Sequence, residues 1–130
     1  MKEIVEKYVS KWNTNAIADL EDIFSVESKY WDSTQEGNAI AVLKSAFADT
    51  HEAFPDVAFQ VLSLSATSEK QFFLEWKMTG TNTGAFLGLP PTGKKIAIQG
   101  LDSIKLASGK ITEIKSFYDS SLFGQQLGLQ

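Results

Sequence analysis

The sequence predicts an α+β fold: N-terminal helices packed on a strongly curved, mostly antiparallel sheet. Three observations predict it. In the first half of the 130-residue chain, apolar residues mainly recur at helical spacing, and in the second half they occupy alternate positions over long stretches. The alternation slips by one position near Val61, which indicates a bulge that bends a strand. Long twisted strands with a bulge curl into a cone, which can enclose an apolar pocket.

Three helices and one short strand are predicted in the N-terminal part. The helices cover residues 2–14, 15–24 and 38–54, and the strand covers 26–31. The third helix is the longest, and it ends before Pro55 because proline cannot continue a helix.

Four longer strands follow, at residues 57–66, 72–79, 95–106 and 110–119, and 120–127 can form a last helical turn. Residues 80–93 form a long Gly- and Pro-rich loop that carries apolar side chains, as expected of a segment folded over the mouth of the domain. No linker or repeat interrupts this order, so residues 1–130 are expected to be a single domain.

Composition narrows the class of function. The net charge is −4 and the two signs are interspersed, so nucleic acid is not expected as a partner. Without cysteine, and with His51 as the only histidine, a metal site is not expected. The absence of a long apolar stretch indicates a cytoplasmic protein and no membrane partner. Nine Phe, three Trp and three Tyr exceed what a minimal core needs, and the surplus could line a cavity.

Asp102 is the sharpest anomaly in the sequence. It stands in an otherwise apolar row formed by the even positions of the strand 95–106. If the alternation holds, Asp102 points into the cone, where burial raises the pKa of a carboxyl and suits it to proton transfer near neutral pH. Two alternatives stay open: a bulge at Gly100 shifts the register, or Asp102 lies at the rim and pairs with a lysine.

Asp119 is the second candidate carboxylate. It ends the last strand on the same face as Phe117, which would suit acid or base chemistry at the mouth of a pocket. The alternative is that Asp119 caps the helical turn that follows. Asp32 and Asp56 follow aromatic residues at the ends of elements and are interpreted as turn or cap residues.

Several C-terminal motifs together resemble the SnoaL-like polyketide cyclase family. They are the segment 80–94 (GTNTGAFLGLPPTGK), then 109–111 (GKI), 117–119 (FYD) and 126–128 (QLG), in the family's order and spacing. The resemblance covers roughly residues 50–129 well and the helical half more loosely. It implies the nuclear transport factor two-like fold, a cystatin-like α+β barrel with a cone shape, and commonly a homodimer formed through the open face of the sheet.

The resemblance also implies chemistry. In the cyclases an aspartate at the position of Asp119 acts as acid and base in an aldol ring closure that needs no metal or cofactor. Asn82 stands where many relatives have histidine, and Ser103 and Lys105 are nearest to two assisting residues of the cyclases. Asp102 is a possible second catalytic carboxylate. The remaining residues expected to bind the substrate are aromatic: Trp31, Trp76, Phe86 and Phe117.

The leading hypothesis is therefore a cofactor-free cyclase or isomerase that acts on a small apolar organic molecule, polyketide- or steroid-like. Two alternatives remain. A non-catalytic binding module of the same fold would hold an apolar metabolite in the same pocket and need no activated carboxylate. A dimerising partner-binding domain would have a filled core without a ligand-sized cavity.

Overall fold

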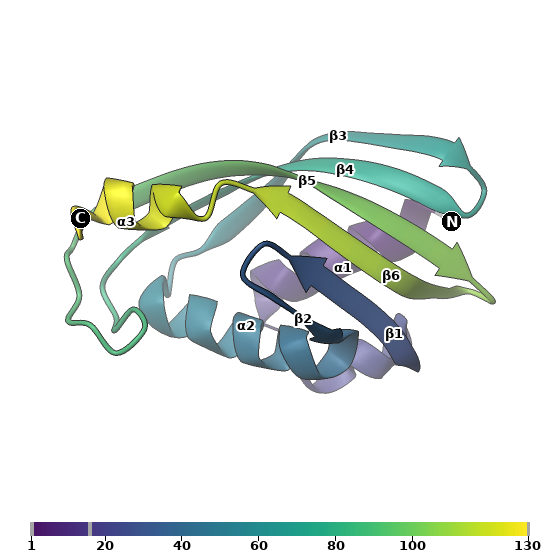
Figure 1. Cartoon of the computed structure of the whole chain (residues 1–130), viewed down its shortest axis with the longest axis horizontal. Helices are drawn as coiled ribbons and strands as arrows, with labels where there is room; N and C mark the ends of the chain where they lie inside the picture. The colour runs from purple at the N-terminus through teal and green to yellow at the C-terminus, as the bar shows by residue number, and fades with distance from the viewer. Residues whose placement is uncertain (1, 16, 130) are drawn as a thin grey trace.

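The computed structural model describes residues 2–15 and 17–129. Along these described residues ten elements follow one another (Figure 1). They are α1 (Lys2–Thr14), the 3-10 helix η1 (Ile17–Asp22), β1 (Phe24–Asp32), β2 (Gln35–Asn38), α2 (Ala39–Ala53), β3 (Ala58–Ser68), β4 (Gln71–Thr81), β5 (Lys95–Ala107), β6 (Lys110–Tyr118) and α3 (Ser121–Leu127).

The strands form one curved sheet in the order β2-β1-β6-β5-β4-β3. The sheet does not close on itself, and every pairing is antiparallel except β1 with β6. Helices α1 and α2 lie on one side of it, and α3 lies beside the N-terminal end of β5 (Figure 1). The predicted α+β fold, with a curved and mostly antiparallel sheet wrapped around N-terminal helices, is confirmed.

Two elements differ from the sequence prediction. Within the segment 15–24, predicted as a helix, residues Ile17–Asp22 form a 3-10 helix and Phe24 already opens β1, while position 16 lies outside the described residues. The short edge strand β2 is the second difference: its sequence QEGN has no apolar residue that could indicate a strand. All four residues are exposed in the structure. Its backbone pairs with β1 at the sheet edge, and such pairing requires no apolar pattern.

The strand irregularities decide which side chains face inward. The bulge predicted in β3 is confirmed by a register shift between Val61 and Ser63. In β5, by contrast, the pairing with β4 runs without a shift through Gly100, so the bulge considered there is absent. The even positions of β5 therefore face the helices along the whole strand, Asp102 included.

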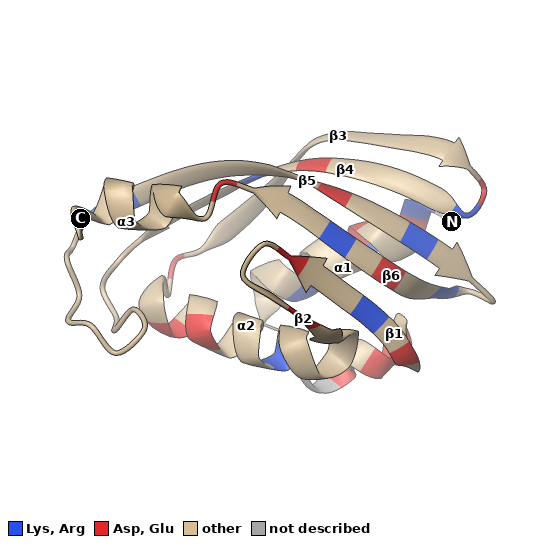
Figure 2. Ribbon diagram, in the orientation of Figure 1, with Lys and Arg blue, Asp and Glu red and all other residues tan. Residues whose placement is uncertain are grey.

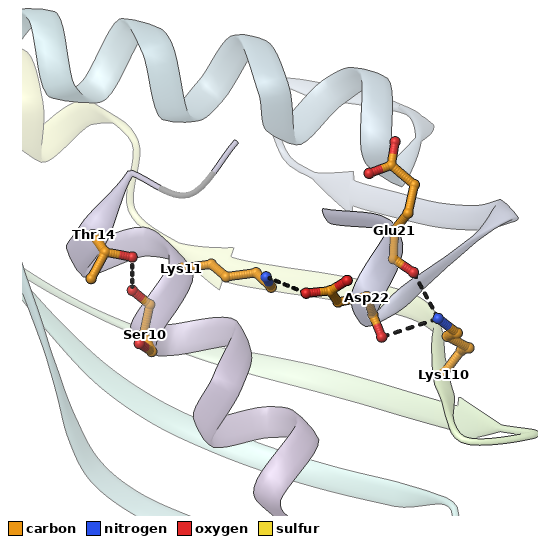
Figure 3. A network of polar contacts seen from close by, with 6 residues as sticks. All are labelled: Ser10, Lys11, Thr14, Glu21, Asp22 and Lys110. Atoms are coloured by element: carbon orange, nitrogen blue, oxygen red, sulfur yellow. Dashed lines mark hydrogen bonds and ion pairs between the residues drawn. The ribbon is translucent and has the colours of Figure 1, made fainter. Parts of the chain in front are cut away.

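Polar contacts fasten η1 to its neighbours (Figure 3). Lys110 Nζ donates hydrogen bonds to the backbone carbonyl oxygens of Glu21 and Asp22, at 2.7 and 3.0 Å. Lys11, a buried residue of α1, places its Nζ 3.6 Å from Asp22 Oδ2. Elsewhere lysines and acidic residues are interspersed along helices and strands (Figure 2). No described helix is both long and apolar enough to cross a bilayer.

Candidate active site

A cavity of about 670 Å³ lies between the concave face of the sheet, the helices α1 and α2, and the segment that carries Phe86. Aromatic side chains from six elements, from the residue after α2 and from that segment supply much of its wall. They are Tyr8, Trp12, Tyr30, Phe54, Phe59, Trp76, Phe86, Tyr118 and Phe123. A concave, mostly apolar space of this size with a few polar groups is typical of a small-molecule site.

Seven of these rings form a continuous series around the cavity. Trp12 contacts Phe59, Phe59 contacts Trp76, and Trp76 contacts Tyr118, with centroid separations from 4.8 to 5.9 Å. Tyr118 continues to Phe123, which stacks on Phe86 at 5.9 Å, and Phe54 lies 5.9 Å from Phe86. The last contacts join the loop after β4 to α3, which lie at the same end of the sheet (Figure 1).

Asp102 lies in the wall of this cavity and is 4% exposed. Its Oδ1 accepts a hydrogen bond of 2.9 Å from Trp76 Nε1, and Ser116 is its cross-strand neighbour on β6. Burial raises the pKa of Asp102 to about 6; hydrogen bonds from Ser116 and Trp76 oppose that rise, and the negative charge of Asp32 adds to it. The carboxyl can therefore both take and give a proton near neutral pH.

Gly100 is what lets Trp76 reach Asp102. The two residues are paired across β4 and β5, and the indole ring lies over the glycine. A Cβ at position 100 would come within 2.3 Å of Trp76 Cζ2, which is far inside van der Waals contact. A larger residue here would displace the indole that donates to the carboxyl.

Asp32 is a second buried carboxylate in the cavity wall, 3% exposed at the end of β1. Its Oδ1 accepts hydrogen bonds from the backbone N–H and hydroxyl of Thr34 and from the backbone N–H of Gln35, at 2.6 to 3.1 Å. Its Oδ2 accepts a hydrogen bond of 2.9 Å from the hydroxyl of Tyr30. The turn-forming role expected for Asp32 is confirmed, and the structure adds a position at the cavity.

Three tyrosines, Tyr8, Tyr30 and Tyr118, line the same cavity as the two carboxylates. Burial, with a further contribution from the charge of Asp32, raises the pKa of Tyr118 to about 12, although a hydrogen bond with Thr34 opposes this. Burial also raises the pKa of Tyr30 and of Tyr8 above the usual range. These phenols stay protonated at neutral pH and so remain hydrogen-bond donors.

The model of the SnoaL-like polyketide cyclase family matches residues 2–127 of the chain. The chain belongs to this family. No curated protein sequence matches it. Solved structures similar to this SnoaL-like chain share its fold at low sequence identity.

AclR from Streptomyces galilaeus, a proposed hydroxylase, is 22% identical with a TM-score of 0.86, over 99% of this chain and 81% of its own. IdmH from Streptomyces antibioticus, a proposed polyketide cyclase, is 18% identical with a TM-score of 0.84, over 98% of this chain and 97% of its own. A protein from Catenulispora acidiphila described as having a ketosteroid isomerase-like fold is 17% identical with a TM-score of 0.81, over 100% and 95% of the two chains.

Asp119, the carboxylate that the SnoaL-like resemblance singles out, lies outside the lining of the cavity. It is exposed, and its Oδ1 accepts hydrogen bonds from the backbone N–H and the hydroxyl of Ser121, at 3.0 and 2.6 Å. Asp119 thus accepts one backbone hydrogen bond from Ser121, the first residue of α3, from the position before the N-cap residue Ser120, so the cap that spacing offered as the alternative is only partly formed. The next residues, Ser120 and Ser121, do reach the cavity wall.

Four other expected site residues lie on the opposite face of the sheet. Because side chains alternate along a strand, the inward positions of Tyr30, Asp102 and Ser116 turn their neighbours outward. The expectation that these four line the pocket is therefore wrong; they are Trp31, Ser103, Lys105 and Phe117. The rings of Trp31 and Phe117 contact each other at 5.4 Å.

Asn82 is also absent from the cavity lining, because its side chain organises the loop after β4. It is completely buried, donates to the carbonyl oxygens of Ala53 and Gly84, and accepts from the N–H and hydroxyl of Thr92. Trp76 and Phe86 do line the cavity, as expected. No group of three metal-binding side chains occurs among the described residues.

Sequence reasoning missed Ser116 and the three tyrosines as cavity residues. The sequence could have predicted two of them, because Ser116 and Tyr118 occupy alternate positions of β6 that share one face of the strand. Tyr8 was assigned to the apolar face of the first helix, and only the packing shows that this face borders a cavity.

Proposed function

We propose that this protein is a cofactor-independent acid/base enzyme, a cyclase or isomerase that acts on an apolar polyketide- or steroid-like molecule. One observation carries the proposal: Asp102 is a buried carboxyl with a pKa of about 6 in the wall of a ligand-sized aromatic cavity. The family supports the cyclase type of reaction. The ligand-sized cavity favours a small-molecule function over the third possibility, a dimerising partner-binding domain with a filled core.

The proposed reaction is a proton transfer through Asp102. The ionised carboxyl takes a proton from a carbon next to a substrate carbonyl, and the electron pair of the broken C–H bond becomes an enolate. In a ring closure this carbon attacks a second carbonyl, and Asp102 returns the proton to the oxygen formed. In an isomerisation the proton returns to a different carbon. The carboxyl ends as it began in either case.

The other polar groups would hold the substrate while this happens. The hydroxyl of Tyr118 remains a donor at neutral pH and could stabilise the oxygen on which negative charge develops. Trp76 keeps Asp102 in place through its 2.9 Å hydrogen bond. The aromatic wall would exclude water and orient a flat ring system.

The first test compares the two candidate carboxylates. We expect Asp102→Asn to lower kcat by about 10²- to 10⁴-fold in the isomerisation of a β,γ-unsaturated steroid ketone and in base-promoted ring opening of nitrobenzisoxazole. Binding of the steroid, followed by tryptophan fluorescence, should change little. Glu113→Gln, on the outer face of β6, is the control. A comparable loss of kcat in Asp119→Asn, with full activity in Asp102→Asn, would show that Asp119 and not Asp102 is the acid/base residue.

The same measurements address the binding module. If the steroid binds and neither probe is turned over by the native protein, the cavity serves to hold a ligand, and Asp102→Asn should then leave affinity unchanged.

We also propose a homodimer formed through the outer face of the sheet. Phe117 is 49% exposed and Leu101 is 41% exposed, and the two are paired across β5 and β6. Trp31 extends this apolar area onto β1. Exposed large apolar side chains that are contiguous on a sheet commonly mark an association surface.

A further inference from the structure

The charged side chains that line the cavity are all acidic. They are Asp32, Asp49 and Asp102, and no lysine or histidine lies among the described lining residues. The twelve basic residues of the chain are all lysines, so no arginine is available for bidentate contact with a ligand carboxylate. The cavity thus has negative charges in its wall and no described counter-ion for them.

The buried Lys11 does not supply a counter-ion for these carboxylates. Lys11 lies on the same helix as Tyr8 and Trp12, but its ammonium group is directed at Asp22 in η1, at 3.6 Å (Figure 3). Lys105 lies on the outer face of the sheet, 3.6 Å from Glu113. Neither ammonium group faces the cavity.

The two buried carboxylates differ in what they can offer a ligand. Asp32 accepts four hydrogen bonds from its own turn and from Tyr30, so it contributes mainly a fixed negative field. Asp102 accepts from Trp76 and Ser116 and can accept a further donor from the cavity side. Fields of this kind are poorly screened inside a cleft with apolar walls.

The aromatic rings favour the same sign of charge. The faces of Trp12, Trp76 and Tyr118 carry the negative part of the ring quadrupole and attract ammonium groups. A ligand carboxylate would lose its hydration in this cavity and find no cation, whereas a ligand amine would meet both carboxylates and ring faces.

We infer that the cavity selects ligands with a protonated amine on an apolar ring framework, accepts neutral ones less tightly, and rejects free carboxylates. The inference rests on the proposed function only in taking this cavity as the substrate site. It follows from the acidic lining, the absence of a facing lysine among the described residues, and the continuous aromatic wall. It names the class of substrate on which the acid/base chemistry would operate.

Three ligands of nearly equal shape test the inference. Adamantylmethylamine, adamantylmethanol and adamantane carboxylate are titrated into the protein near neutral pH and followed by calorimetry. We expect the amine to bind at least ~10-fold more tightly than the alcohol, and the carboxylate at least ~10-fold more weakly than the alcohol. Asp102→Asn should reduce the advantage of the amine and strengthen binding of the carboxylate.

The control is Glu75→Gln, which removes the same charge from the outer face of β4 and should leave the ranking intact. Equal affinities for the three ligands, no binding of any of them, or an amine advantage that is undiminished in Asp102→Asn would each overturn the inference. Activity is read separately. Equal affinities alongside a large loss of kcat in Asp102→Asn would overturn the charge selectivity alone, whereas the expected ranking with unchanged kcat would overturn only the acid/base role.

Discussion

Asp102 connects the stability of this protein to its proposed chemistry. A carboxyl that is buried among apolar groups is more costly to ionise than one in the unfolded chain, and burial is the main reason that its pKa rises from 3.8 to about 6. Tyr8, Tyr30, Tyr118, Asp32 and Asp49 line the same cavity, and among them the charge of Asp32 contributes to the raised pKa of Asp102. The environment that could make Asp102 useful as a base is thus one that costs stability when it is ionised.

The pH dependence of unfolding should show this cost. Between pH about 4 and about 6 the folded protein holds a proton on Asp102 that the unfolded chain has released, so the contribution of Asp102 to stability is lost as pH rises through this range. Asp102→Asn removes the ionisable group and keeps an acceptor for Trp76. We expect the variant to be more stable than the native protein above pH ~7, by up to about 3 kcal/mol, and equally stable near pH ~4.

Urea denaturation of both proteins at the two pH values measures this difference. A variant that is less stable than the native protein at both values would show that Asp102 is a structural hydrogen-bonding residue without an elevated pKa.

The pairing of β4 with β5 is the element that places the site. Unbroken register puts Trp76 opposite Gly100 and Leu74 opposite Asp102, so that the indole can cross the glycine to the carboxyl. A shift by one residue would turn Asp102 outward, where Ser103 and Lys105 now lie.

Gly100→Ala tests this arrangement. The added methyl group would meet the indole at 2.3 Å, and the ring must move away from Asp102. We expect a loss of about 1–3 kcal/mol in the free energy of unfolding and a changed near-ultraviolet circular dichroism signal from tryptophan. Ser103→Ala, on the outward face of the same strand, is the control and should alter neither. An unchanged tryptophan signal in Gly100→Ala would mean that the indole does not depend on the glycine.

The two faces of the sheet have different surroundings. The concave face, with its helices, borders the cavity, and the outer face leaves Trp31, Leu101 and Phe117 partly exposed. The aromatic residues predicted as pocket lining were thus divided between the two faces, and the outer ones became the basis for the proposed dimer.

Phe117→Lys should dissociate the proposed homodimer. A charge at the centre of an apolar interface loses its hydration without gaining a partner, so we expect the dissociation constant to rise by at least ~100-fold in analytical ultracentrifugation. Ala48→Lys adds the same charge to an exposed position on α2 and should leave the mass unchanged. A native protein that sediments as a monomer at every concentration would contradict the proposal.

The sequence by itself determined the fold class, most of the strands, the bulge in β3 and the anomaly at Asp102, because these depend on local periodicity. It also predicted the long apolar loop and the inward positions of Trp76 and Phe86. It could not identify the polar strand β2, which needs only a neighbouring backbone.

Only the tertiary structure decided which carboxylate reaches the cavity and which side chains gather around it. From the sequence pattern both Asp102 and Asp119 are candidates for the carboxylate that lines the cavity. Strand register turns Asp102 toward the cavity, whereas Asp119 accepts hydrogen bonds from Ser121 in a local turn. Asp32 comes from β1 and Ser116 and Tyr118 come from β6, and together with Asp102 of β5 they line one cavity. Alternation along one strand predicts a face; the meeting of several faces depends on contacts between residues far apart in the chain.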